Sequence, residues 1–84
     1  MVRTDAVFSA ADRMTPEIAV SLARLAEKFT ADLTIGYDTT SIQLDSLIGV
    51  LSLDLRRGKS LWVLGNGTDE AEAVDAICKA LTAG

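Results

Sequence analysis

The sequence predicts an α+β fold in which three helices pack on one face of a mainly antiparallel four-stranded sheet. Apolar residues alternate with polar ones in four short segments, as in strands, and recur at helical spacing in three others. The resulting order is strand, helix, strand, strand, short helix, strand, helix, which is typical of a layered α+β domain. The 84 residues are enough for one small domain, residues 1–84, with one modest core.

The first two predicted elements are a strand over residues 2–9 and a helix that begins at Pro16. Thr15 is a good N-cap, and Pro16 suits the first helical position, where its missing N–H costs nothing. Glu17 adds a favourable negative charge to the first turn. The apolar stripe of this helix is formed by Ile18, Leu22, Leu25 and Phe29.

A hairpin and a short helix are expected in the middle of the chain. Residues 33–37 and 40–44 alternate in hydropathy, and Asp38-Thr39 between them is a plausible hairpin turn. Ser46 then stands where the spacing changes from strand to helix, which suits an N-cap. A short helix is predicted to follow over residues 47–55, and Arg56-Arg57-Gly58-Lys59 is interpreted as a solvated turn that ends it.

Residues 60–64 are the predicted fourth strand, Gly65-Asn66-Gly67 a turn, and residues from Asp69 onward the final helix. Asp69 and Glu72 have capping-box spacing, although Thr68 is an alternative cap. The buried stripe of this helix is predicted to be Ala73, Val74, Ile77, Cys78 and Leu81.

The sheet face opposite the helices is expected to meet solvent. On it the alternation places Asp5, Val7, Thr34, Ser41, Gln43, Trp62 and Leu64. Trp62 with Leu64 and Val7 would form an apolar patch there. Two interpretations stay open: a homodimer surface on the Trp62 face, or ordinary exposed apolar residues.

Composition excludes several function classes. The net charge of −4 and the lack of a basic cluster argue against nucleic-acid binding, and no apolar run approaches the length of a membrane span. The first residues do not resemble a signal peptide, and a single cysteine, Cys78, suits a reducing compartment, so a cytoplasmic protein is expected. The absence of histidine removes histidine catalysis and histidine metal ligation, and neither a metal nor another cofactor is expected.

Three blocks of the chain resemble the HPr family, the small phosphocarriers of the bacterial phosphoenolpyruvate-dependent sugar phosphotransferase system. The blocks are Lys28–Ile35, Ser46–Leu53 and Gly67–Val74. The resemblance implies the family's open-faced sandwich and a non-enzymatic role. The middle block is especially similar to HPr proteins in which the serine matching Ser46 is phosphorylated by a regulatory kinase. The apolar residues after that serine dock partners there, so Leu47, Ile48 and Leu51 are candidate docking residues here, with ordinary core as the alternative.

The resemblance breaks at the family's phosphohistidine motif. By the resemblance, Thr15 stands at the phosphohistidine position and Glu17 at the position of the phosphate-binding arginine. Without a histidine to act as base, a threonine hydroxyl is a poor nucleophile. We therefore expect an HPr-like regulatory or adaptor protein with no catalytic residues, acting through contacts around Ser46. Its expected partners are an HPr kinase or a phosphotransferase-system regulator. The alternatives are a phosphocarrier by homology and a self-associating structural module.

Overall fold

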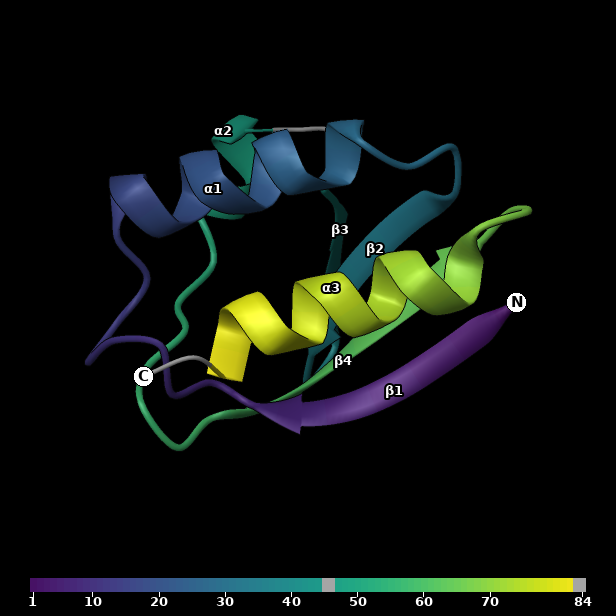
Figure 1. Ribbon diagram of the computed structural model, residues 1–84. Coiled ribbons are helices and arrows are strands. Elements are labelled where there is room, and N and C mark those ends of the chain that lie inside the picture. Colours follow the sequence, from purple (N-terminus) through teal and green to yellow (C-terminus); the bar gives the residue numbers. More distant parts are fainter. Residues whose placement is uncertain (45–46, 83–84) are drawn as a thin grey trace.

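A four-stranded antiparallel sheet carries all the helices on one of its faces (Figure 1). The computed structural model describes residues 1–44 and 47–82, with Leu47 described by its backbone. The elements are β1 (Val2–Val7), α1 (Pro16–Glu27), β2 (Asp32–Tyr37), β3 (Thr40–Gln43), α2 (Leu47–Leu51), β4 (Ser60–Asn66) and α3 (Glu70–Thr82). This arrangement confirms the predicted element order and fold class.

Strand β4 lies inside the sheet, whose spatial order is β1-β4-β2-β3. It pairs with β1 on one side and with β2 on the other, both antiparallel. The hairpin between β2 and β3 turns at Asp38, which has a φ of 52°, a conformation that aspartate tolerates better than most residues. Strand β4 is therefore bonded on both sides to strands that come much earlier in the sequence.

The core lies between this sheet and the two long helices. Alternate residues of the inner strands point into it, while each helix contributes one stripe. The fully buried large side chains are Phe8, Leu22, Ile35, Leu44, Leu55, Ile77, Leu81, Val50, Val63 and Val74. The apolar stripes predicted from helical spacing face this core. All four buried residues of α3 belong to the predicted stripe, and in α1 Leu22 belongs to it while Ala19 lies beside it.

The predicted helix over residues 47–55 was too long. Helix α2 ends at Leu51, where the Ser52 hydroxyl donates to the Gly49 carbonyl at 2.7 Å. Leu53 and Leu55 are buried beyond it, outside any helix or strand, and the Leu55 carbonyl accepts a hydrogen bond from the Met14 N–H at 2.9 Å. Leu51, Leu53 and Leu55 are spaced two residues apart, as in a strand, while Leu51 and Leu55 are also four apart, as in a helix. Periodicity alone therefore could not show where the helix ends.

Strand β4 is longer than predicted and includes Gly65 and Asn66, which the sequence had suggested as a turn. Gly65 is needed inside the strand because an added Cβ would lie 2.6 Å from the Cγ2 of Val74. Here the small residue permits close packing of α3 on the sheet and is not a sign of a turn. The other differences are at the ends of elements, where assignments shift easily.

Trp62 lies on the open sheet face as predicted, but it is half-buried. Its ring covers Gly36, where a Cβ would come within 2.2 Å of the Trp62 Cζ2, and the Arg3 guanidinium carbon lies 5.1 Å from the ring centroid. Leu64 is also half-buried, whereas Val7 is 47% exposed. The apolar patch of this face is therefore smaller than the sequence suggested, because Arg3 and β2 already contact the indole.

Asp69 joins two loops that are far apart in sequence. Its carbonyl accepts from the Ala73 N–H at the start of α3. Its carboxylate accepts from the Thr30 N–H at 2.9 Å, the Ala31 N–H at 2.8 Å and the Thr30 hydroxyl at 3.2 Å. The expected capping box between Asp69 and Glu72 was wrong. Among the described residues, the Asp69 carboxylate bonds to Thr30 and Ala31 in the loop before β2, and not to Glu72.

These bonds predict a pH-dependent contribution of Asp69 to stability. The Thr30 and Ala31 N–H groups lower the pKa of the Asp69 carboxyl below its ordinary value, against a smaller opposing effect of desolvation. Because the folded-state pKa is the lower one, the stabilisation is complete above the unfolded-state pKa, about 3.9, and is lost as the pH falls through the folded-state pKa. We expect Asp69→Asn to destabilise at pH 7, and the difference from wild type to shrink towards pH 2.

Urea unfolding at a series of pH values measures this difference. Asp32→Asn, which changes an exposed carboxylate at the start of β2, is the control and should show little effect. A difference between wild type and Asp69→Asn that stays constant with pH would show that the ionised carboxylate is not the stabilising group.

Candidate functional site

Thr15 begins helix α1 and uses its side chain to do so. Its backbone is extended, with φ −121° and ψ 160°, and its hydroxyl oxygen accepts a hydrogen bond from the Ile18 N–H at 3.3 Å. Pro16 follows at the start of the helix. This is the geometry of an N-cap, and it confirms the predicted cap. The Thr15 hydroxyl oxygen is therefore already used as the acceptor of the Ile18 N–H.

Glu17 is exposed in the first turn of α1, two residues after Thr15. A carboxylate there stabilises the helix because it lies near the positive end of the helix dipole. The same negative charge opposes the binding of a phosphate at this end of the helix, because like charges repel. The two residues thus suit a capped helix start better than a phosphate site.

The segment that leads to Thr15 is paired with the segment that follows α2. The Met14 N–H donates to the Leu55 carbonyl at 2.9 Å, and Arg13 forms an isolated antiparallel bridge with Arg56. Helix α2 also contacts α1 directly. The segment that leads into α1 and the segment that follows α2 therefore lie side by side.

Two of the predicted docking residues are on the surface of α2. Ile48 is 83% exposed and Leu51 is 44% exposed, whereas Val50 on the opposite side is fully buried. This excludes the core alternative for Ile48 and Leu51. Ser46 lies outside the described residues, as does the Leu47 side chain. The regulatory role of Ser46 and the docking role of Leu47, Ile48 and Leu51 stay predictions.

Cys78 is half-buried in α3, less buried than predicted. Desolvation raises the pKa of its thiol above the ordinary value, and Asp75 adds to the shift. A thiol with a raised pKa is mostly protonated at neutral pH and therefore reacts slowly.

The described part of the chain contains neither a cluster of metal ligands nor a membrane-spanning helix. No group of three acidic or thiol side chains within residues 1–44 and 47–82 gathers where a metal ion could bind. None of the helices in those ranges combines the length and the apolar character that crossing a bilayer requires.

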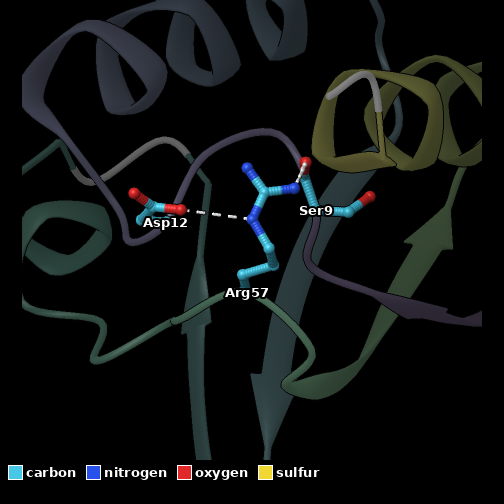
Figure 2. Close-up of polar contacts among 3 residues, drawn as sticks. All are labelled: Ser9, Asp12 and Arg57. Atoms are coloured by element: carbon cyan, nitrogen blue, oxygen red, sulfur yellow. Dashed lines mark hydrogen bonds and ion pairs between the residues drawn. The ribbon is translucent and has the colours of Figure 1, made fainter.

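Arg57 is the residue that the sequence interpretation missed. The sequence predicts only a solvated turn at this position, but the Arg57 guanidinium extends to the segment before Thr15, where it contacts Asp12 and Ser9 (Figure 2). The partners are more than 40 positions apart, and no spacing pattern links them. Only the fold brings them together.

The cap predicts that Thr15 contributes to stability. We expect Thr15→Ala to lower the free energy of unfolding by about 1 kcal/mol, because the Ile18 N–H loses its acceptor. Thr15→Ser keeps the oxygen and should cost clearly less. Thermal or urea unfolding of the three proteins measures this, and equal stability of the alanine and serine variants would contradict the capping role.

Solved structures with the same fold are similar to the chain over almost its whole length. HPr from Bacillus anthracis str. Ames is 24% identical, with 95% of each chain covered and a TM-score of 0.89. HPr-C-His from Thermoanaerobacter tengcongensis is 20% identical, with 100% of this chain and 98% of the other covered and a TM-score of 0.87. Crh, the Bacillus subtilis catabolite repression containing protein, is 22% identical over 99% and 95%, with a TM-score of 0.79, and its structure is a dimer with a swapped domain.

Sequence comparison identifies the family. The family model PTS-HPr, described as the PTS HPr component phosphorylation site, matches residues 14–83, which is most of the chain. Its members are phosphocarriers and not enzymes. The match agrees with the sheet order, the helix placement and the three sequence blocks. The chain therefore belongs to the HPr family of the phosphotransferase system.

Proposed function

We propose that this chain is a regulatory or adaptor member of the HPr family that does not carry phosphohistidine and acts by binding proteins around Ser46. One observation carries the proposal: the 84 residues contain no histidine. A phosphohistidine relay needs an imidazole nitrogen to accept the phosphoryl group, and no other side chain forms the same phosphoramidate.

Thr15 is a poor substitute for that imidazole. Its hydroxyl oxygen accepts the Ile18 N–H at 3.3 Å, and no histidine exists to remove its proton. A phosphothreonine ester would also lack the transfer potential of a phosphoramidate. Glu17, which is exposed nearby, adds repulsion where a phosphate would need a cation.

The exposed side of α2 supports binding to a protein. Ile48 and Leu51 expose apolar surface that contributes little to this domain's own core. Ser46 and Leu47 stand next to them in the sequence. A phosphate on Ser46 would add about two negative charges and several strong acceptors beside this surface, enough to change which partner binds. We place the protein in the cytoplasm, with an HPr kinase or a phosphotransferase-system regulator as its partner.

Two alternative functions have some support. Family membership favours an ordinary phosphocarrier. The swapped dimer of Crh favours self-association, with the Trp62 face as the predicted surface in this chain. The half-burial of Trp62 and Leu64 weakens this second alternative. The absence of histidine weakens the first, which the following experiment tests directly.

We expect no phosphoryl transfer from enzyme I to the wild-type chain. The measurement is incubation with enzyme I and labelled phosphoenolpyruvate, followed by a test for acid-labile label, with a histidine-containing HPr as positive control. The double variant Thr15→His/Glu17→Arg should gain such label if Thr15 occupies the family's phosphoacceptor position. Acid-labile label on wild type would overturn the proposal.

We expect an HPr kinase with ATP to label the wild-type chain and not Ser46→Ala. Ile48→Asp should reduce the initial rate of labelling roughly tenfold, because a charge would interrupt the apolar contact surface. Val7→Asp is the matched control, since Val7 is also exposed but lies on β1. An unlabelled wild type would exclude the kinase switch, and equal rates for the two aspartate variants would exclude docking through α2.

A further inference from the structure

Arg57 contacts both ends of a short segment that precedes Thr15 (Figure 2). Its Nε donates to Asp12 Oδ1 and its Nη1 donates to the Ser9 carbonyl, each at 3.2 Å. Its backbone N–H donates to the Asp12 carbonyl at 2.8 Å. One residue thus makes three hydrogen bonds that hold residues 9–12 at both ends.

Backbone pairing explains why this segment needs such a contact. Before it, Phe8 is paired with the segment after Arg57, through the Phe8 N–H to the Lys59 carbonyl and the Gly58 N–H to the Phe8 carbonyl. After it, the Met14 N–H bonds to the Leu55 carbonyl. Residues 9–11 leave this pairing, which resumes at the Asp12 carbonyl, and the Arg57 side chain contacts both Ser9 and Asp12 across the gap.

The far side of the segment is held by the end of α3. The Ser9 and Ala10 N–H groups both donate to the Leu81 carbonyl at 3.0 Å, and the Ser9 hydroxyl donates to the Thr82 carbonyl at 3.1 Å. These bonds fix the beginning of the segment. At its other end, Asp12 is bound through Arg57, and Thr15 follows three residues later.

We propose that Arg57 is a positioning residue, a salt-sensitive latch that holds residues 9–12 and, through them, the backbone that leads to the Thr15 cap. The Asp12 side chain is 95% exposed and that of Arg57 54% exposed, so dissolved ions reach the ion pair and weaken it. The bond to the Ser9 carbonyl joins a cation to a neutral oxygen and is less dependent on salt. The latch fixes the backbone at the start of α1, and this role does not depend on phosphorylation of Ser46.

Amide hydrogen exchange measured by NMR tests the latch without any partner protein. In Arg57→Ala we expect the Met14 and Ile18 amides to exchange roughly threefold faster, because the side-chain contacts that hold the segment are lost while the backbone bond to Asp12 remains. Amides of the central strand, such as Val63, should keep their rates. In wild type, about 0.5 M NaCl should produce part of the same change.

Arg56→Ala is the matched control, because Arg56 is a neighbouring exposed arginine whose side chain pairs with Asp54 and not with residues 9–12. It should leave the Met14 and Ile18 amides unchanged. Unchanged exchange rates of the Met14 and Ile18 amides in Arg57→Ala would overturn the proposal. So would an equal effect of Arg56→Ala, or a uniform acceleration that includes Val63, since these would indicate a general charge or stability effect.

Discussion

The structure depends on the two-sided pairing of β4. This strand bonds to β1 and β2, and its inward residues Leu61 and Val63 are almost completely buried beneath the helices. The other elements are arranged around β4. Strand β3 pairs with its neighbour β2, and α1 and α3 pack on the core that includes Leu61 and Val63. Because the pairing joins the first strand to residues about 60 positions later, most of the domain must be present before the sheet can close.

The sequence was sufficient to predict the elements and the fold class, because these follow from short-range patterns. The strand order joins distant segments and was not predicted. Strand alternation and helical stripes identified the elements, and Thr15-Pro16 located the start of α1 within one residue. Periodicity failed where two periods coincide, at Leu53 and Leu55, and where Gly65 serves close packing inside a strand. These are properties of the neighbours of a residue in space, which a local pattern does not contain.

The candidate site was predictable only in part, for the same reason. The sequence shows that the chain has no histidine, and the family resemblance predicted that Thr15 stands at the phosphoacceptor position. The apolar residues of α2 were also predicted as a candidate surface. The exposure of Ile48 could not, since an apolar residue of a short helix suits a core equally well. The contact between Arg57 and Asp12 joins residues 45 positions apart and depends on how two loops meet. The predictions for Thr15 and Ser46 thus came from the sequence, and the structure added the exposure of Ile48 and the contacts of Arg57.

Trp62 has a practical consequence for the study of this protein, because it is the one tryptophan in the chain. Its indole lies across Gly36 of β2 and beneath Arg3 of β1, so three strands meet at a single fluorophore. Trp62 alternates along β4 with Leu61 and Val63, which are buried beneath the helices, so its indole is on the opposite face of the sheet. The helices all lie on one side of the sheet (Figure 1). Intrinsic emission should therefore follow the assembly of the sheet while remaining insensitive to a ligand that occupies the helical side, which gives an optical signal for folding that is independent of binding.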